Sequence, residues 1–401
     1  MTSHRLVLVL LIVVCFGSVA LAQNVVYTGC LKSADGSLYS VRAGTAPMSP
    51  CKAKDKQISW NMAGQPGPQG PPGPSLLPTL EVNVNCDEGQ SVNEALAQQA
   101  ERLTVSISGN CAQHVAITRD DVTLQGVGTN PTITAPAGSG ETLEIRGAQR
   151  VVIQGFAVMG SPSAGIWAGE GASFSAHQLK ISNSRGVGLD LQKGVTAYLG
   201  DSEISGNGGE GVKVYDGSSL YLSNVEIIDN AEKGVWAVCS TLTFQGTNVA
   251  RNASGVWLRA SHAEGRTGGN TILDNGGTGF FLEEGSGMFL EHSRVAGNGE
   301  EGLLVSGSSA ASLADVIVQN NRNGGVVATG GSSVGVGGAS TIEGGTEVSG
   351  ILLRDSCTIN GPPAEGSITG FPYGIECAGP PSVSQIAGSV PANLSTNCPH
   401  T

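Results

Sequence analysis

Short segments in which apolar residues alternate with other residues run along most of the chain. Residues 211–228 hold three such segments, each with two apolar residues on one side of the backbone: Val212 and Val214, Leu220 and Leu222, and Val225 and Ile227. A period of two is typical of strands with one buried face. The pattern predicts three short strands separated by tight turns.

The three-strand pattern returns about every 23 residues. The unit GVKV, opened by Gly211, is followed 23 residues later by GVWA, opened by Gly234. Ten glycines open such units: Gly165, Gly188, Gly211, Gly234, Gly255, Gly279, Gly302, Gly325, Gly350 and Gly374. Asparagines form a second column, four residues before their glycines: Asn207, Asn230, Asn275, Asn298 and Asn321. Two columns in register predict a solenoid with three strands in each coil.

These glycine units and stacked asparagines resemble the right-handed parallel β-helix family, with the pectate-lyase-like fold, over about residues 110 to 385. The resemblance implies an all-β right-handed parallel β-helix of about twelve coils. We expect each glycine where the backbone turns tightly into the first strand. We expect each asparagine at a turn, where its amide bonds along a ladder and its backbone adopts a left-handed conformation.

The first segments of the chain predict export. Residues 1–22 combine basic residues, an apolar run and a final Ala-Leu-Ala, as in a secretory signal peptide, so we expect a secreted or cell-surface protein. Residues 23–62 form a small module. Residues 63–78 form a Gly/Pro-rich linker with four collagen-like Gly-x-y triplets, which favours a polyproline II spacer over a trimerising stem. This module and linker resemble bacterial collagen-like surface proteins.

Residues 79–401 are predicted to hold the β-helix and a C-terminal tail. Near residues 91–103, Ser91 and Glu94 match a capping box. Apolar residues follow at helical spacing: Val92, Ala95, Leu96, Ala100 and Leu103. We expect a short amphipathic helix that covers the first coil.

Composition narrows the classes of function. The chain has 60 glycines, 39% hydrophobic and 13% charged residues, which is too apolar for a disordered protein. Its net charge of −12, without a basic cluster, argues against binding to nucleic acid. After residue 22 no apolar stretch is long enough for a membrane span. Nothing in the sequence indicates a cofactor or a metal.

Eight cysteines remain after the predicted leader, an even number that indicates disulfides in an exported chain. The preferred pairs are Cys30 with Cys51 and Cys86 with Cys111. The other four stay unassigned: Cys239, Cys357, Cys377 and Cys398.

The position two residues after each repeat glycine should point outward, yet six consecutive coils carry an apolar residue there: Trp236, Trp257, Phe281, Leu304, Val327 and Leu352. Three interpretations are open. A loop or the tail after Pro380 covers this ridge; or it contacts a protein partner or further copies of the chain, as in a trimer; or its rings stack on a polysaccharide. We take Trp236, Trp257, Phe281 and Leu304 as binding residues.

Charged residues offer weaker sites. Glu203 and Glu226 share an outward column that ends at Ala250, and such a pair can raise one carboxyl pKa for acid/base work. Asp190 and Lys213, one coil apart, predict a surface ion pair. A longer coil gathers Arg259, His262, Glu264 and Arg266 near Glu283 and Glu284.

The catalytic motifs of β-helical polysaccharide lyases and polygalacturonases do not occur in this sequence. We therefore expect a non-catalytic protein with a structural, adhesive or binding role through the ridge. The alternative is a polysaccharide lyase, epimerase or glycoside hydrolase that holds an extended glycan along the β-helix.

Overall fold

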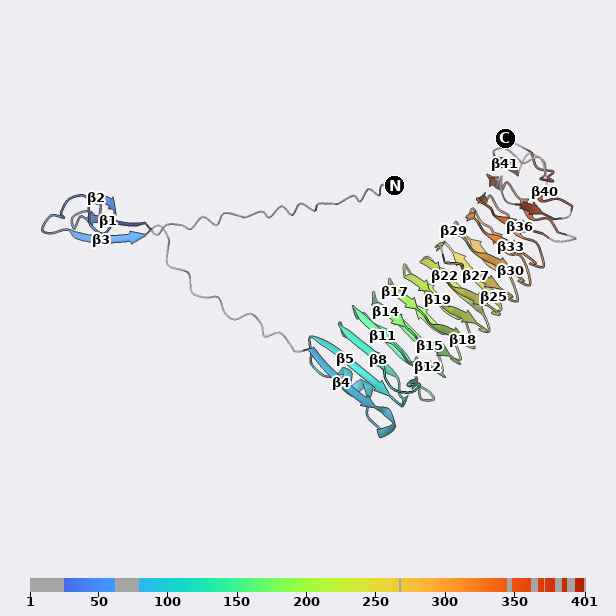
Figure 1. The fold of residues 1–401 in the computed structure, drawn as a ribbon, viewed down its shortest axis with the longest axis horizontal. Coiled ribbons are helices and arrows are strands. Elements are labelled where there is room, and N and C mark those ends of the chain that lie inside the picture. The colour runs from blue at the N-terminus through green and yellow to red at the C-terminus, as the bar shows by residue number, and fades with distance from the viewer. Residues whose placement is uncertain are drawn as a thin grey trace, which may run out of the picture. The chain divides into compact units, whose positions relative to one another are not determined.

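The computed structural model describes residues 25–61, 79–266, 268–344, 348–361, 367–370, 372–378, 384–387 and 394–399. The chain divides into two compact units, Met1–Ser75 and Leu76–Thr401 (Figure 1). The predicted leader (1–22) and the predicted linker (63–78) lie outside the described residues.

The described part of the first unit is a three-stranded antiparallel sheet in the order β2-β1-β3. Its strands are β1 (Val26–Leu31), β2 (Leu38–Ala43) and β3 (Lys56–Asn61). The disulfide Cys30–Cys51 ties β1 to the segment before β3, which confirms the first predicted cysteine pair.

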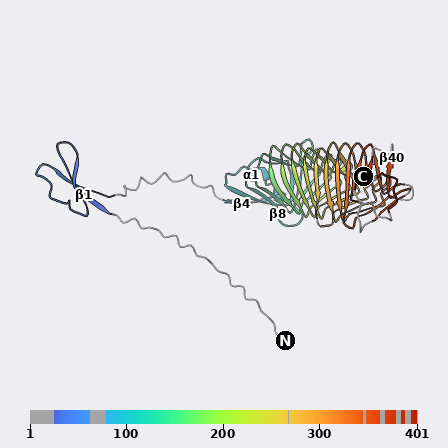
Figure 2. The same cartoon turned by 90° about the horizontal axis from the view of Figure 1, so that it is seen from above.

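The second unit is a solenoid of three parallel sheets, which confirms the predicted all-β β-helix architecture (Figures 1 and 2). The first sheet has 12 strands: β7 (Val115–Ile117), β10 (Leu143–Arg146), β13 (Ile166–Gly169), β16 (Leu189–Leu191), β19 (Val212–Tyr215), β22 (Lys233–Val238), β25 (Ser254–Arg259), β28 (Phe280–Glu283), β31 (Leu303–Val305), β34 (Val326–Ala328), β37 (Ile351–Arg354) and β40 (Ile375–Ala378).

The second sheet has 14 strands: β4 (Thr79–Asn85), β5 (Arg102–Ser108), β8 (Val122–Gly126), β11 (Val151–Gln154), β14 (Ser173–His177), β17 (Thr196–Gly200), β20 (Ser219–Ser223), β23 (Thr241–Gln245), β26 (His262–Gly265), β29 (Gly287–Glu291), β32 (Ala310–Ala314), β35 (Ser333–Gly337), β38 (Thr358–Asn360) and β41 (Gln385–Ala387). The third sheet has 12 strands: β6 (Asn110–Ala112), β9 (Thr132–Thr134), β12 (Ala157–Met159), β15 (Lys180–Ser182), β18 (Glu203–Ser205), β21 (Glu226–Ile228), β24 (Asn248–Ala250), β27 (Thr271–Leu273), β30 (Arg294–Ala296), β33 (Ile317–Gln319), β36 (Thr341–Glu343) and β39 (Ser367–Thr369).

Each complete coil contributes one strand to each sheet, so its main-chain hydrogen bonds go to the coils before and after it. The apolar residues predicted to point inward in the coil that Gly211 opens are all buried: Val212, Val214, Leu220, Leu222, Val225 and Ile227. Burying a side chain of this kind is worth about 1.5–3 kcal/mol, so successive coils add to one continuous core.

Buried asparagines form a ladder where the third sheet turns into the first. The Asn207 Nδ2 donates to Asn230 Oδ1 (2.9 Å), and the same oxygen accepts from the Asn207 backbone N–H (3.1 Å). The ladder continues through Asn252, Asn275, Asn298 and Asn321. The predicted ladder is present, and it includes Asn252, which the sequence analysis missed.

The left-handed conformation expected of the ladder asparagines lies elsewhere. It occurs at the corners of each coil, for example at Asp216 (φ 55°), Asn224 (φ 54°) and Asp229 (φ 57°). The ladder asparagines have no positive φ, because they are selected for their amides and not for a backbone turn.

The repeat glycines also have a different cause from the one expected. Gly211 and Gly234 have no positive φ. A Cβ built on Gly234 would collide with Val249, and it would lie 2.8 Å from the Asn252 Nδ2 and 3.1 Å from the backbone oxygen of Gly255, which opens the next coil. Along the column the same two contacts recur: the backbone oxygen of the next repeat glycine and an aliphatic side chain of the third sheet, joined in five coils by the ladder amide. Glycine therefore recurs because these contacts leave no room for a side chain.

The predicted helix near 91–103 is shorter than expected. Ser91 caps α1 (Val92–Leu96), and Val92, Ala95 and Leu96 are buried in the solenoid core. Leu103 belongs to β5, where apolar residues at every second position favour a strand. No helix in the described part of the chain is long and apolar enough to cross a membrane.

Disulfides close both ends of the second unit. Cys86–Cys111 confirms the second predicted pair, and Cys377–Cys398 pairs two cysteines that the sequence left open. Cys239 and Cys357 are free thiols.

The glycine column can be tested by Gly234→Ala. The added methyl group overpacks the contact with the next coil, so we expect the free energy of unfolding to fall by about 1–3 kcal/mol, measured by urea denaturation. The control is Gly140→Ala, where the new Cβ meets nothing within 4 Å and φ is not positive. Equal stability of the two variants would contradict the steric role of Gly234.

Candidate binding surfaces

The predicted ridge is present on the outer face of the first sheet. Strand pairing places Trp236, Trp257, Phe281, Leu304, Val327 and Leu352 directly beside one another on successive strands. None of the six side chains is fully exposed; five are half-buried and Val327 is buried.

The aromatic half of the ridge packs against itself. The rings of Trp257 and Phe281 lie 4.7 Å apart, and Tyr215 meets Trp236 edge-on at 5.3 Å. The Lys233 Nζ lies over both indoles, 4.4 Å from the centroid of Trp236 and 4.8 Å from that of Trp257. Ring faces are what a sugar stacks on, and here they are turned toward neighbouring coils and lysines. The geometry therefore argues against sugar stacking on Trp236 and Trp257.

The surface ion pair expected between Asp190 and Lys213 is not formed. The Lys213 Nζ lies over the rings of Tyr215 (4.8 Å) and Trp236 (5.4 Å) instead. Asp190 is 9% exposed and accepts hydrogen bonds from the Gln192 Nε2 at 3.0 and 2.9 Å. Burial raises the pKa of Asp190 above its ordinary value, because the charged form is poorly solvated.

The described parts of the C-terminal tail pack at the end of the solenoid. Residues 384–387 contain β41, the last strand of the second sheet. Thr396 forms a bridge with Ile375 on β40, and Ser395 accepts a hydrogen bond from the backbone of Ile375. Pro380, after which the tail was expected to cover the ridge, lies outside the described residues.

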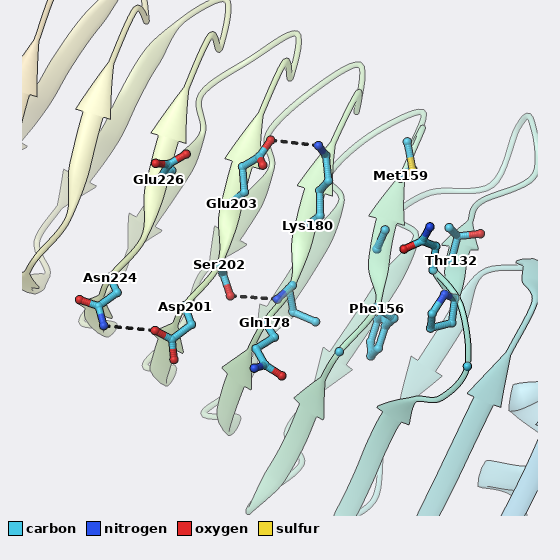
Figure 3. Close-up of a pocket in the computed structure, with 16 residues that line it drawn as sticks. Thr132, Phe156, Met159, Gln178, Lys180, Asp201, Ser202, Glu203, Asn224 and Glu226 are labelled. Atoms are coloured by element: carbon cyan, nitrogen blue, oxygen red, sulfur yellow. Dashed lines mark hydrogen bonds and ion pairs between the residues drawn. The ribbon is translucent and has the colours of Figure 1, made fainter.

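A groove of about 820 Å³ crosses the third sheet and the corner that leads into it (Figure 3). It spans five strands, from β9 to β21, or roughly 19 Å at the usual strand spacing. The strands contribute Thr132, Met159, Lys180, Glu203 and Glu226, and the corners contribute Asn130, Gln178, Asp201 and Asn224. Each coil thus adds at least one residue from a strand, and four of the five add a polar residue from a corner.

Hydrogen bonds and ion pairs fix part of the groove. The Lys180 Nζ lies 3.2 Å from Glu203 Oε1, and the Asn224 Nδ2 donates to Asp201 Oδ1 at 3.1 Å (Figure 3). The Ser205 Oγ donates to Glu203 Oε1 at 2.6 Å. This hydrogen bond, together with Lys180, holds the pKa of Glu203 below its ordinary value. The hypothesis that the Glu203–Glu226 pair raises a carboxyl pKa is therefore wrong for Glu203.

Glu203 and Glu226 do share one column, since they are paired on β18 and β21. The next residue in that column is Asn248, not the expected Ala250. The coil between Gly234 and Gly255 has 21 residues because two of its corners are each one residue shorter, which shifts the alignment.

The charged residues of the longer coil fall into two groups on either side of a corner. Arg259 ends β25 in the first sheet and pairs with Glu284, with Glu283 4.0 Å away. His262 and Glu264 lie on β26 in the second sheet, 3.7 Å apart, where Arg266 also pairs with Glu264. These are surface pairs of the kind that contributes little stability. His262 and Glu284, one from each group, line an open pocket of about 540 Å³ at this corner together with Cys239.

Among the described residues, no group of three His, Cys, Asp or Glu side chains is placed to hold a metal ion.

Comparison with known proteins identifies the architecture. The model of the "Right handed beta helix region" matches residues 141–267 and 262–361, which together span 221 of the 401 residues. The chain belongs to the right-handed β-helix family. The comparison with curated proteins finds no match for this β-helix chain.

Solved structures share the β-helix fold at low sequence identity. The Dettilon tailspike protein is 10% identical, with a TM-score of 0.51, over 76% of this chain and 70% of that one. The DFA-IIIase of Arthrobacter chlorophenolicus A6, without its lid and in complex with GF2, is 11% identical, with a TM-score of 0.50, over 71% and 88%. The A-module of a mannuronan C-5 epimerase from Azotobacter vinelandii is 16% identical, with a TM-score of 0.43, over 72% and 93%.

The buried carboxyl beside the ridge generates a pH-dependent prediction. Because its folded-state pKa is raised, Asp190 destabilises the folded chain as the pH rises from the unfolded-state pKa through the folded one. Asp190→Asn should therefore raise the melting temperature at pH 7 and change it little at pH 3. The same change at the exposed corner residue Asp216 is the control. A lower melting temperature for Asp190→Asn at pH 7 would show that the charge is stabilising.

Proposed function

We propose that this chain is an exported, non-catalytic β-helix protein that binds an extended neutral polysaccharide in the groove of the third sheet. The observation that carries the proposal is the corner row of the groove, where Gln178, Asp201 and Asn224 present hydrogen-bonding side chains on three successive coils at the strand spacing. A ligand that repeats along its own length can make the same contacts coil after coil.

The chemistry of the groove suits hydroxyl groups. Carboxylates such as Asp201 and Glu226 accept hydrogen bonds, and amides such as Gln178 and Asn224 both donate and accept them. The half-buried side chains of Ala157 and Met159 add apolar surface between these groups. A few placed polar groups over an apolar base is the usual composition of a small-molecule or sugar site.

Charge favours a neutral ligand over an acidic one. The groove contains the carboxylates Asp201, Glu203 and Glu226 against the single lysine Lys180, a sum of −2. The whole chain carries −12, so a polyanionic glycan would be repelled at long range as well.

The charged state of Glu203 argues against it as the acid of a glycoside hydrolase and leaves it only the role of base or nucleophile. Glycoside hydrolysis needs a carboxylic acid that keeps its proton near neutral pH. Ser205 and Lys180 stabilise the charged form of Glu203, which is unsuited to that role. The enzyme alternative places Glu203 and Glu226 as the acting pair, because their strands are adjacent.

The groove is tested by Glu226→Ala in a binding screen with soluble neutral polysaccharides. Loss of one hydrogen bond to a charged acceptor, about 1.4 kcal/mol, should weaken binding about tenfold in calorimetry. The control is Glu343→Ala, which removes a glutamate from the same sheet outside the groove. If no neutral polysaccharide binds, or both variants bind like the wild type, the proposal fails.

The same incubations distinguish the enzyme alternative. A binding protein returns the polysaccharide unchanged in length after hours. New reducing ends or unsaturated products that disappear in Glu203→Gln would establish the enzyme instead.

A second role, adhesive contact with protein, is favoured by the aliphatic half of the ridge. Leu304 and Leu352 are half-buried on the outer face of the first sheet. Val327 and Leu352 also line a pocket of about 400 Å³ with Arg354 and Glu376 at its edge. Such a pocket fits an apolar anchor of a protein partner or of another copy of the chain.

Leu304→Ser with Leu352→Ser tests this role. If the ridge is adhesive, the wild type should form larger particles as its concentration rises in light scattering, and the variant should not. Phe289→Ser, which removes an exposed ring from the second sheet, is the control. Identical scattering by wild type and ridge variant would exclude the adhesive role.

A further inference from the structure

One face of the three-stranded sheet in the first unit is apolar. Residues directly opposite one another in an antiparallel sheet point to the same side. Tyr27 lies opposite Trp60, Gly29 opposite Ile58, and Leu31 opposite Leu38. Val41 lies over Gly29, since its Cγ2 is 2.9 Å from where a Cβ of that glycine would be. We call this set the module face: Tyr27, Leu31, Leu38, Val41, Ile58 and Trp60.

The opposite face of the same sheet is already covered. Thr28 and Cys30 point to that side and are fully buried. The Thr28 Oγ1 donates to the backbone oxygen of Gly44 (2.6 Å), and Cys30 is bonded to Cys51. The segment from Gly44 to Cys51 therefore packs on one side of the sheet and leaves the apolar side open.

The module face is exposed to an unusual extent for apolar side chains. Leu38 is 47% and Val41 38% exposed, and the other four members are half-buried. Of the seven exposed large apolar side chains in the described part of the chain, four belong to this unit: Val26, Leu38, Val41 and Met48. A contiguous apolar sheet face open to water marks a contact surface.

We infer that the module face binds two further copies of the same chain, so that the protein is a trimer held at its first unit. The sequence after β3 is the reason for proposing three copies. β3 ends at Asn61, and four Gly-x-y triplets begin at Gly64. Glycine at every third position is what three chains packed around one axis require.

The module face and the Gly-x-y triplets each supply what the other lacks. Four triplets are too few to hold three chains together alone, and a small sheet with one open apolar face needs a cover. Contact through the module face brings three triplet segments to a high effective concentration, because two residues separate β3 from Gly64.

Charge distinguishes this partner from an anionic membrane. Residues 25–61 carry five basic and two acidic residues, a sum of +3, which suits a lipid surface. By strand pairing, however, Arg42 lies opposite Thr28 on the covered side, and Lys56 is the basic residue that the paired strands place on the module face. The centre of the module face is apolar, as in contacts between protein chains.

The test is the molar mass of the full chain, produced with its leader so that it is exported, by light scattering after size-exclusion chromatography. The wild type should have three times the mass of one chain. Leu38→Asp with Val41→Asp should reduce it to that of one chain, because a charge at each site opposes burial. Met48→Asp, which places the same charge at an apolar side chain 71% exposed and outside the module face, should leave the trimer intact.

Folding of each variant is checked by the Cys30–Cys51 disulfide in mass spectrometry. If the double variant loses it, Leu38→Lys at the most exposed position should still raise the concentration for half-assembly at least tenfold. A wild type of one or two chains, or a double variant that stays trimeric, would overturn the inference. So would a monomeric wild type that binds phosphatidylglycerol vesicles through Leu38 and Val41.

Discussion

Stacking of each coil in register on the coil before it is the constraint on which the rest of the second unit depends. Main-chain hydrogen bonds in this solenoid run between coils, so a residue at one level is fixed by its equivalents at the neighbouring levels. The asparagine ladder shows the consequence most clearly. From Asn230 to Asn321 each buried amide oxygen accepts two hydrogen bonds from the preceding ladder asparagine. Close contacts between stacked coils in the same way exclude a side chain from the repeat glycines.

Much of the fold could be predicted because equivalent positions of stacked coils need similar residues, so these residues recur once per coil in the sequence. Alternating apolar residues gave the strands, and the glycine and asparagine columns gave the coil. The failures have local causes. One coil is shortened at two corners, which hid Asn252 and misplaced Ala250. Leu103 suits both a helix and a strand, and alternation with Val105 and Ile107 decides for the strand.

The surfaces were less predictable, because they depend on side chains from separate columns. The ridge followed from one column, but Lys233, which covers its two indoles, is the first residue of β22 and belongs to another column. Glu203 and Glu226 were noted, yet the groove also needs Gln178 and Asn224, whose column carries no sequence signature. In the first unit, a bulge at Ser40, with φ of 53°, interrupts the alternation that would have revealed the module face.

Coil register is tested most directly by disulfide cross-linking across the third sheet. Glu203 and Glu226 are strand neighbours, and Asn248 lies one coil further on. Paired strand positions are about 4.8 Å apart, within the range of a disulfide, and positions two coils apart are beyond it. Cysteines at 203 and 226 should cross-link on mild oxidation, and cysteines at 203 and 248 should not, as read by mass spectrometry of tryptic peptides. A cross-link in the second pair and none in the first would contradict the stacked register.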